Sequence, residues 1–139
     1  MATPAELDEI INQHFMFEAT NNVDGVVASL AENFTHEVFP MTVGTVTETS
    51  KVRDFYSWLF DNIHGRDVTP LKRYYGEEFL IDETVWHGEV EDGAPLGFPG
   101  MSGMVSFRML HVFEIVDGKI RKEQVWCDSA SIEEQLTAK

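Results

Sequence analysis

Apolar residues recur at helical spacing near the start of the chain. Thr3-Pro4-Ala5-Glu6 predicts a helix start, because Thr3 can cap the helix, Pro4 suits its first turn and Glu6 completes a capping box. The positions that follow on one face are Leu7, Ile10, Ile11, His14, Phe15 and Glu18. All of these except His14 and Glu18 are apolar, so we expect this face to pack inward. Asn21-Asn22 ends the run.

Two shorter helices and one strand are expected next. Asp24 can cap a second helix, and its apolar positions are Val26, Val27 and Leu30. Residues 34–39 are typical of a strand, which Pro40 closes. A third helix is expected to open at Thr49 or Ser50 and to end at Gly65. Its apolar face consists of Val52, Phe55, Tyr56, Leu59 and Ile63.

After Gly65 the pattern changes to strands. Strands are predicted over 68–75, 79–90, 104–116 and 119–127, and Asp117-Gly118 joins the last two as a hairpin. The glycine- and proline-rich segment 91–103 is expected to be a loop. Asp128 or Ser129 is expected to cap a last helix that ends near Leu136. Helices followed by antiparallel strands predict an α+β fold with the helices on one face of a curved sheet.

Composition narrows the class of protein. A chain of 139 residues with 43% hydrophobic residues can form a single folded domain over 1–139. Its net charge of −14 repels phosphate backbones and anionic lipids, so neither nucleic acid nor membrane is expected as a partner. Cys127 is the only cysteine, which rules out an intrachain disulfide. The chain has no signal-peptide pattern and no 18-residue apolar run, and we expect a cytoplasmic protein.

The strand and hairpin sequences resemble a known family. The stretch His111-Val112-Phe113-Glu114-Ile115-Val116-Asp117-Gly118-Lys119-Ile120, then Val125-Trp126-Cys127-Asp128 and Gln135-Leu136, is similar to the SnoaL-like polyketide cyclase branch of the nuclear transport factor 2-like superfamily. The resemblance implies a cone-shaped α+β fold. Three N-terminal helices would pack on a curved antiparallel or mixed sheet, with a short C-terminal helix. It also implies proton-transfer chemistry without a cofactor, in a pocket between sheet and helices.

The resemblance carries over to particular positions. His111 falls where cyclases and isomerases of this class place an acid or a histidine. Val125 stands where epoxide hydrolases and cyclases carry a carboxylate, and Phe39 where ketosteroid isomerases carry their base. These apolar replacements argue against isomerase and epoxide hydrolase activity. The dehydratase branch instead uses histidines on neighbouring strands, and His87 and His111 could take those places.

His111 is the strongest catalytic candidate from the residues themselves. It is the only polar residue on the strand face Val105, Phe107, Met109, His111, Phe113 and Ile115. A two-residue turn at Asp117-Gly118 would place His111 opposite Gln124, whereas a type I turn with a bulge at Gly118 would place it opposite Glu123. We favour the bulged register, in which Glu123 orients the imidazole, and Trp126, Leu110 and Val112 face outward. An apolar outer face predicts a homodimer.

Other candidates have a structural interpretation beside the functional one. Asp128 is a candidate catalytic acid or a helix cap; His87 and His36 are surface or pocket residues; Tyr56 offers a hydroxyl to the cavity or packs in the core. The expected ligand-binding residues are Phe39, Tyr56, Met109, Phe113, Val125 and Phe17. No histidine or cysteine spacing predicts a metal site. Leu96, Phe98 and Met101 on the 91–103 loop suggest an apolar lid.

Three functions compete at this point. The first is a cofactor-free lyase, isomerase or cyclase that uses His111 and Glu123 on a hydrophobic substrate with a carbonyl or hydroxyl group. The second is a protein that binds a small hydrophobic ligand without transforming it. The third is a structural dimerisation domain with a filled interior.

Overall fold

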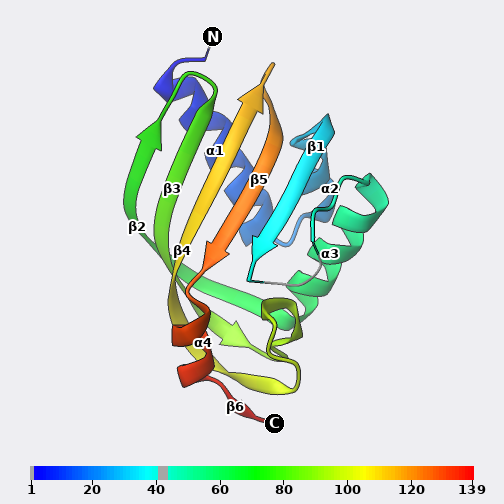
Figure 1. The fold of residues 1–139 in the computed structure, drawn as a ribbon, viewed down its shortest axis with the longest axis vertical. Helices are drawn as coiled ribbons and strands as arrows, with labels where there is room; N and C mark the ends of the chain where they lie inside the picture. The colour runs from blue at the N-terminus through cyan, green and yellow to red at the C-terminus, as the bar shows by residue number, and fades with distance from the viewer. Residues whose placement is uncertain (1, 41–43) are drawn as a thin grey trace.

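The computed structural model describes residues 2–40 and 44–139, which form four α-helices and six strands (Figure 1). The helices are α1 Pro4–Ala19, α2 Val23–Ala28, α3 Thr49–Asn62 and α4 Ser129–Gln135. The strands are β1 Leu30–Phe39, β2 Ile63–Tyr75, β3 Phe79–Val90, β4 Met101–Val116, β5 Lys119–Cys127 and β6 Thr137–Ala138. A short 3₁₀ helix, η1, spans Ala94–Leu96. The predicted α+β class is confirmed: three helices lie in the first half of the chain, with β1 between α2 and α3, and a short fourth helix lies near the C-terminus.

The strands form one mixed sheet in the order β1-β5-β4-β3-β2, and β6 pairs with the start of β4. β1 runs parallel to β5, and the other pairs along this order are antiparallel. In Figure 1 α1 runs behind the sheet, so the sheet has an inner face toward the helices and an outer face toward the viewer. None of the helices in the described ranges is long and apolar enough to cross a membrane.

Two hydrophobic clusters lie on the inner side of the sheet. The first packs α1, α2 and α3 against the sheet and includes Leu7, Ile11, Val52, Phe55 and Phe113. The second lies toward α4 and includes Ile63, Leu96, Phe107, Ile132 and Leu136. The two clusters hold the helices on one face of the sheet. Room for a site is left between the helices and the sheet.

Helix starts follow the local sequence, with two corrections. The predicted capping box is present: the Thr3 hydroxyl accepts a hydrogen bond from the Glu6 N–H at 3.2 Å. Asn22, and not Asp24, caps α2, because its side-chain oxygen accepts from the Gly25 N–H at 2.9 Å. The predicted end of α3 at Gly65 is also wrong. Ile63 already has an extended backbone, so the chain passes directly into β2.

The β4–β5 hairpin decides which residues face inward. Asp117 and Gly118 have φ of 51° and 75°, which defines a two-residue type I′ turn, so the predicted bulge at Gly118 is wrong. An irregularity farther along, beside Arg121, shifts the register by one residue and places His111 opposite Val125. Neither predicted partner therefore lies directly across from His111. Glu123 still shares the inner face, two residues before Val125 on β5, as the favoured interpretation required.

Candidate functional site

A cavity of about 1050 Å³ lies between the inner face of the sheet and the helices. Its lining changes along β3 and β4. Trp86 and Phe107 are cross-strand partners in an apolar part that also includes Ile63 and Leu96. Farther along the same two strands, the wall becomes polar at the cross-strand pair Asp82 and His111, with Thr84, His36 and Tyr56. The cavity therefore offers a long apolar surface beside a compact polar one.

Three histidines direct their Nε2 atoms at one carboxylate, Glu123, which is completely buried. The distances from Nε2 to the nearest carboxylate oxygen are 3.2 Å for His14, 3.7 Å for His36 and 3.8 Å for His111. The Tyr56 hydroxyl donates to the same carboxylate at 2.9 Å. Only the His14 and Tyr56 contacts have hydrogen-bond length, so the other two imidazoles are near neighbours of the charge.

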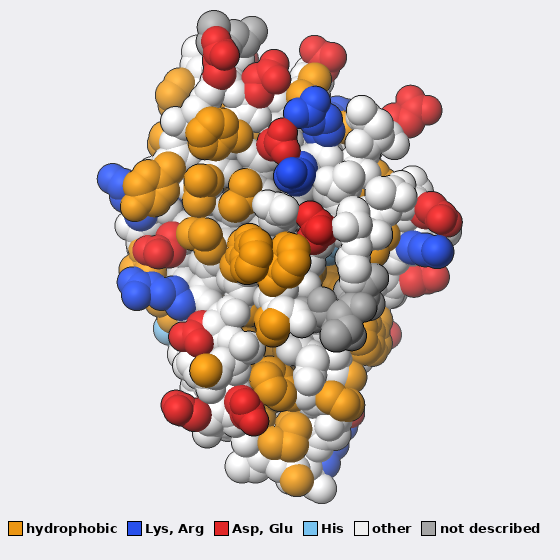
Figure 2. Space-filling model, viewed as in Figure 1, with side chains coloured by type: hydrophobic (Ala, Val, Ile, Leu, Met, Phe, Trp, Pro, Cys, Tyr) orange, Lys and Arg blue, Asp and Glu red, His pale blue; other side chains and the backbone are white. Residues whose placement is uncertain are grey.

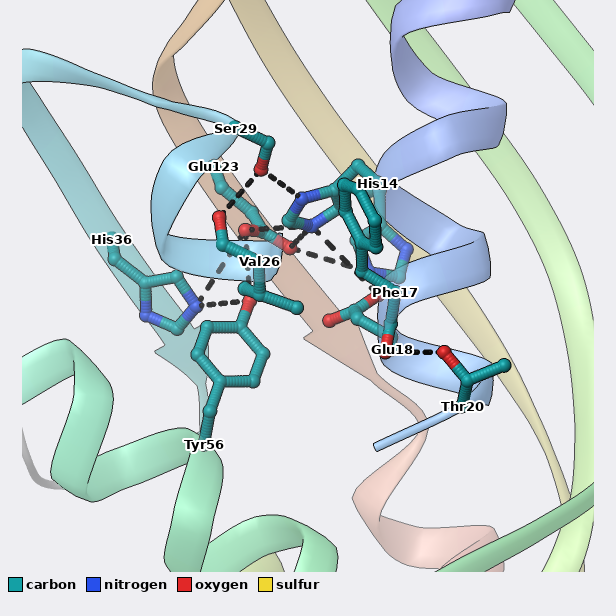
Figure 3. A network of polar contacts seen from close by, with 10 residues as sticks. His14, Phe17, Glu18, Thr20, Val26, Ser29, His36, Tyr56 and Glu123 are labelled. Atoms are coloured by element: carbon teal, nitrogen blue, oxygen red, sulfur yellow. Dashed lines mark hydrogen bonds and ion pairs between the residues drawn. The ribbon is translucent and has the colours of Figure 1, made fainter. Parts of the chain in front are cut away.

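Each member of this cluster comes from a different element, as Figure 3 shows for all but His111. His14 lies on the buried face of α1 and bonds Ser29 Oγ through Nδ1 at 2.8 Å. His36 comes from β1, and its Nε2 lies 3.0 Å from the Tyr56 hydroxyl of α3. Glu123 and His111 come from β5 and β4. Packing of the helices on the sheet therefore assembles the cluster.

A single carboxylate can balance the charge of one imidazolium. For Glu123 that imidazolium is His14. Burial opposes a charge on His14, but Glu123 and Glu18 outweigh it and raise the pKa of His14 to about 9. Burial likewise opposes a charge on His111, and here it prevails over the attraction of Glu123, lowering the pKa of His111 to about 4. Burial also lowers the pKa of His36. At neutral pH the cluster holds a charged His14 beside two neutral histidines.

The two carboxyl groups near His14, those of Glu123 and Glu18, also differ in pKa. Burial alone would raise the pKa of Glu123, but the histidines around it lower the pKa below its usual value, so Glu123 is ionised. Burial and the charge of Glu123 raise the pKa of Glu18 above the usual range, although His14 opposes them. Burial and Glu123 also raise the pKa of Tyr56 well above its ordinary value, which keeps its hydroxyl as a donor. Two carboxyl groups with separated pKa values are typical of acid–base sites.

A second polar group lies beside His111. Arg73 of β2 donates through Nε to Asp82 Oδ2 at 2.7 Å, and through its other nitrogens to Asp8 and Asn12 of α1, both at 2.8 Å. Three buried atoms of the adjoining wall have no hydrogen-bond partner in the described part of the chain. They are Asp82 Oδ1, Thr84 Oγ1 and His111 Nδ1.

A divalent cation is a further chemistry to consider at the His14 cluster. Ligand atoms of His14, Glu18 and Glu123 lie within 4.8 Å of one another, and imidazole with two carboxylates is a suitable donor set. Both ring nitrogens of His14 are, however, already within hydrogen-bond distance of Ser29 and Glu123. The two nitrogens of His14 therefore already have partners within the protein.

Comparison with known proteins identifies the family. A family model described as the SnoaL-like domain matches residues 11–123. The chain belongs to the SnoaL-like family. The resemblance predicted from the hairpin and strand sequences is therefore confirmed. No curated protein matches the sequence.

Solved structures share the SnoaL-like fold at low sequence identity. A proposed SnoaL-like polyketide cyclase from Shewanella denitrificans OS-217 has a TM-score of 0.78 at 9% identity, covering 96% of this chain and 97% of the other. An NTF2-like protein from Burkholderia pseudomallei K96243 has a TM-score of 0.76 at 14% identity, covering 99% and 100%. An LEH-like epoxide hydrolase from M. tuberculosis has a TM-score of 0.72 at 13% identity, covering 94% and 88%. At these identities the likeness establishes the fold.

Several residues proposed from sequence meet at the cavity. Tyr56, Met109, His111 and Val125 line it, and the buried Glu123 contacts Tyr56 and lies 3.8 Å from His111. Phe113 stacks on the His111 ring, with centroids 5.3 Å apart and planes at 7°, and so fixes the imidazole without lining the cavity. Cys127 also lines the wall. Burial raises the pKa of the Cys127 thiol to about 12, so it contributes a neutral surface.

Other proposed residues lie elsewhere. His87 is on the outer face of β3, where its nitrogens are 2.8 Å from Thr69 Oγ1 and 2.7 Å from Ser106 Oγ. Even-numbered β3 residues point inward here, which excludes His87 from the cavity. Asp128 caps α4, accepting from the Ser131 N–H. Phe39 stacks on Trp126 on the outer face, and Phe17 packs over Gly25 between α1 and α2.

The loop interpreted as a lid is part of the core. Leu96 is buried in the second hydrophobic cluster with Ile63 and Ile132, and it lines the cavity together with Pro95. Gly93 and Phe98 pair as an isolated bridge at the base of the loop. Because its apolar residues are packed in this way, the segment forms a wall of the cavity and not a hinged cover.

Several polar residues of the site were not predicted as site residues from the sequence. His14 and Glu18 interrupt an otherwise apolar helix face at i and i+4, and this exception was the signal that could have found them. Asp82 and Thr84 show the same pattern, as polar residues at the inward positions of β3. Arg73 carried no such signal, since β2 is exposed along most of its length.

Proposed function

We propose that this chain is a cofactor-independent acid–base enzyme of the lyase, isomerase or cyclase type, acting on a hydrophobic substrate with a carbonyl or hydroxyl group. One observation carries the proposal. His111, neutral at pH 7, lies on the wall of a largely apolar cavity with the ionised Glu123 at its back. A neutral imidazole can accept a proton, and a carboxylate 3.8 Å away stabilises the imidazolium that results.

The reaction begins with proton abstraction next to the substrate carbonyl. The C–H bond breaks as an N–H bond forms on His111, and the electron pair moves to the carbonyl oxygen to give an enolate. If the enolate is conjugated with a neighbouring double bond, return of the proton from His111 to the far carbon gives an isomer. In the lyase reaction the carbonyl re-forms as the bond from the β-carbon to a hydroxyl breaks, and this hydroxyl takes the proton from His111 and leaves as water. With the His111 proton on Nε2, toward Glu123, the unpartnered Nδ1 is the basic nitrogen. Glu123 acts as a positioning residue in this scheme.

Two other functions remain as alternatives. A binding protein without catalysis is favoured by the apolar residues Phe39 and Val125, which stand where related enzymes carry acids. A structural domain with a filled interior is disfavoured by the cavity of about 1050 Å³. The likeness to a proposed polyketide cyclase and to an epoxide hydrolase supports a small-molecule role for the cavity.

Deuterium exchange tests the catalytic proposal without knowledge of the natural substrate. 2-Decalone, a bicyclic ketone, is incubated with the protein in D₂O, and loss of its α-protons is followed by ¹H NMR. We expect the wild type to accelerate exchange and His111→Gln to reduce the acceleration by about 100-fold or more. The wild-type rate should fall as His111 is protonated, near pH 4. Absence of acceleration by the wild type would leave the binding function in its place, and equal acceleration by both proteins would exclude His111 as the base.

Glu123→Gln tests the positioning role in the same assay. Removing the charge makes His111 a weaker base, so we expect exchange to slow by about tenfold and the acid limb of the pH profile to move to lower pH. Glu114→Gln on the same hairpin removes a surface carboxylate paired with Arg121 and Lys122 and is the matched control. A slower rate with an unmoved acid limb would mean that Glu123 has only a structural role.

We further propose a homodimer formed through the outer face of the sheet. Hydrophobic side chains gather at the centre of that face over β4 and β5 (Figure 2). Trp126 is 46% exposed there, stacked on Phe39 with ring centroids 4.0 Å apart. Exposed apolar patches of this kind often mark contacts between identical subunits.

A further inference from the structure

We propose that Asp82 and Thr84 form a subsite that binds a hydroxyl group of the ligand beside His111. The inference deepens the proposed function, on which it rests for the role of the cavity. It adds a hydroxyl group to the substrate, besides the carbonyl from which His111 starts the reaction, and assigns a residue pair to recognise that hydroxyl.

Asp82 is held in place from one side only. It is 3% exposed, and its Oδ2 accepts from Arg73 Nε at 2.7 Å. The Arg73 guanidinium is itself fixed, because it also donates to Asp8 and Asn12 of α1. Burial works against the charge of Arg73, but Asp82 and Asp8 raise its pKa further, so a permanent cation sits behind Asp82. The carboxylate therefore has a fixed orientation and a second oxygen left over.

The leftover oxygen and the neighbouring hydroxyl both lack partners. Asp82 Oδ1 and Thr84 Oγ1 are buried, and neither has a hydrogen-bond partner in the described part of the chain. Both residues line the cavity, on the same face of β3 and two positions apart. Buried polar atoms without partners are unfavourable, and their occurrence in a cavity wall indicates groups kept for a ligand.

The two atoms have complementary hydrogen-bonding needs. A carboxylate oxygen can only accept, whereas a threonine hydroxyl can donate. One ligand hydroxyl satisfies both, because its hydrogen goes to Asp82 Oδ1 and its oxygen accepts from Thr84. A ligand carbonyl satisfies Thr84 alone and brings a second acceptor up to the carboxylate. The pair therefore favours an alcohol over a ketone of the same shape.

The place of the pair links recognition to the proposed chemistry. Asp82 is the direct cross-strand partner of His111, so their Cβ atoms are about 5 Å apart. A hydroxyl held by Asp82 and Thr84 brings the adjoining carbon skeleton against His111, and the apolar body of the ligand extends toward Trp86 and Phe107. The substrate class that fits is a hydroxylated hydrophobic compound.

The test compares two bicyclic probes of matched shape, decahydro-2-naphthol and 2-decalone, by calorimetric titration at pH 7. We expect the wild type to bind the alcohol about tenfold more tightly than the ketone. Asp82→Asn adds an amide donor and should remove most of this preference. Thr84→Val keeps the shape and lacks the hydroxyl, so it should weaken alcohol binding by about five- to tenfold. Thr35→Val on the outer face of β1, with its fold checked like the others by circular dichroism, should change neither affinity.

Each outcome decides the proposal. A wild type that fails to bind the alcohol more tightly than the ketone overturns the subsite, and so does a preference that survives in both Asp82→Asn and Thr84→Val. Because this is a binding measurement, it is separate from the exchange assay. Alcohol preference without His111-dependent exchange would keep the subsite and reject the enzyme. His111-dependent exchange without a preference for the alcohol would keep the enzyme and reject the subsite.

Discussion

At the scale of single residues, the central fact is that His14, His36 and His111 share one carboxylate and differ in protonation. The direct bond of 3.2 Å to Glu123 gives His14 the charge, while the other two histidines lie farther from Glu123. Position in the fold therefore separates three chemically identical side chains into one cation and two potential bases. The separation is what leaves His111 available for proton transfer at neutral pH.

The charge on His14 predicts a pH-dependent contribution to stability. Because the pKa of His14 rises from 6.5 to about 9 on folding, its contribution is complete below pH 6.5 and is lost as the pH rises through 9. We expect the difference in free energy of unfolding between wild type and His14→Gln to shrink by up to about 3 kcal/mol across this window. Urea denaturation at pH 6 to 9 measures it.

His87→Gln is the control for that series, since His87 lies on the outer face and contacts no buried carboxylate among the described residues. A difference between wild type and His14→Gln that stays constant from pH 6 to 9 would mean that Glu123 does not hold a charged His14.

At the scale of elements, most of the fold follows from local sequence patterns. The bounds predicted for β3 and β5, the capping box of α1 and the inward face of β4 all agree with the structure. Local signals failed at the register of the β4–β5 hairpin. The irregularity beside Arg121 moves the register of the β4–β5 pair, and the sequence between residues 114 and 122 carries no glycine or proline to indicate it except at the turn.

The polar site shows the same limit. His111 and Glu123 could be found because they alternate along neighbouring strands, and Tyr56 because it lies on an apolar helix face. His14 meets Glu123 only through the packing of α1 on the sheet, 109 positions away in the sequence. Asp82 is oriented by Arg73, which also donates to two residues of α1. Such convergence is a tertiary property, so the sequence supplied the candidates without their partners.

Arg73 joins three elements, which gives a prediction at this scale. Its Nε, Nη1 and Nη2 each bond a different partner on α1 or β3, an arrangement that a lysine ammonium cannot reproduce. We expect Arg73→Lys to lower the free energy of unfolding by about 1–3 kcal/mol in urea titrations. Arg66→Lys on the same strand, at an exposed pair with Glu89, should cost less than about 1 kcal/mol. Equal effects of the two changes would show that the three-way contact adds no stability.

At the scale of the whole molecule, the helices and the cavity occupy the inner face of the sheet. Among the residues that the structure describes, the outer face carries apolar side chains that remain partly exposed. Leu110 and Val112 are half-buried on that face, and Trp126 is exposed between them and β1. The surrounding surface is acidic, with a net charge of −14 for the chain, which opposes random association. An apolar centre on such a molecule favours one defined contact.

This arrangement predicts that the protein is a dimer and that Trp126→Lys makes it a monomer. The substitution places a charge in the middle of the apolar face, and burying that charge in an interface without a partner is unfavourable. Light scattering coupled to size-exclusion chromatography measures the mass. Met16→Lys, at an exposed methionine on α1, is the matched control and should remain dimeric. A monomeric wild type, or a Trp126→Lys variant that stays dimeric, would contradict the proposal. Because the cavity lies on the opposite side of the sheet, the monomeric variant should keep its His111-dependent exchange activity.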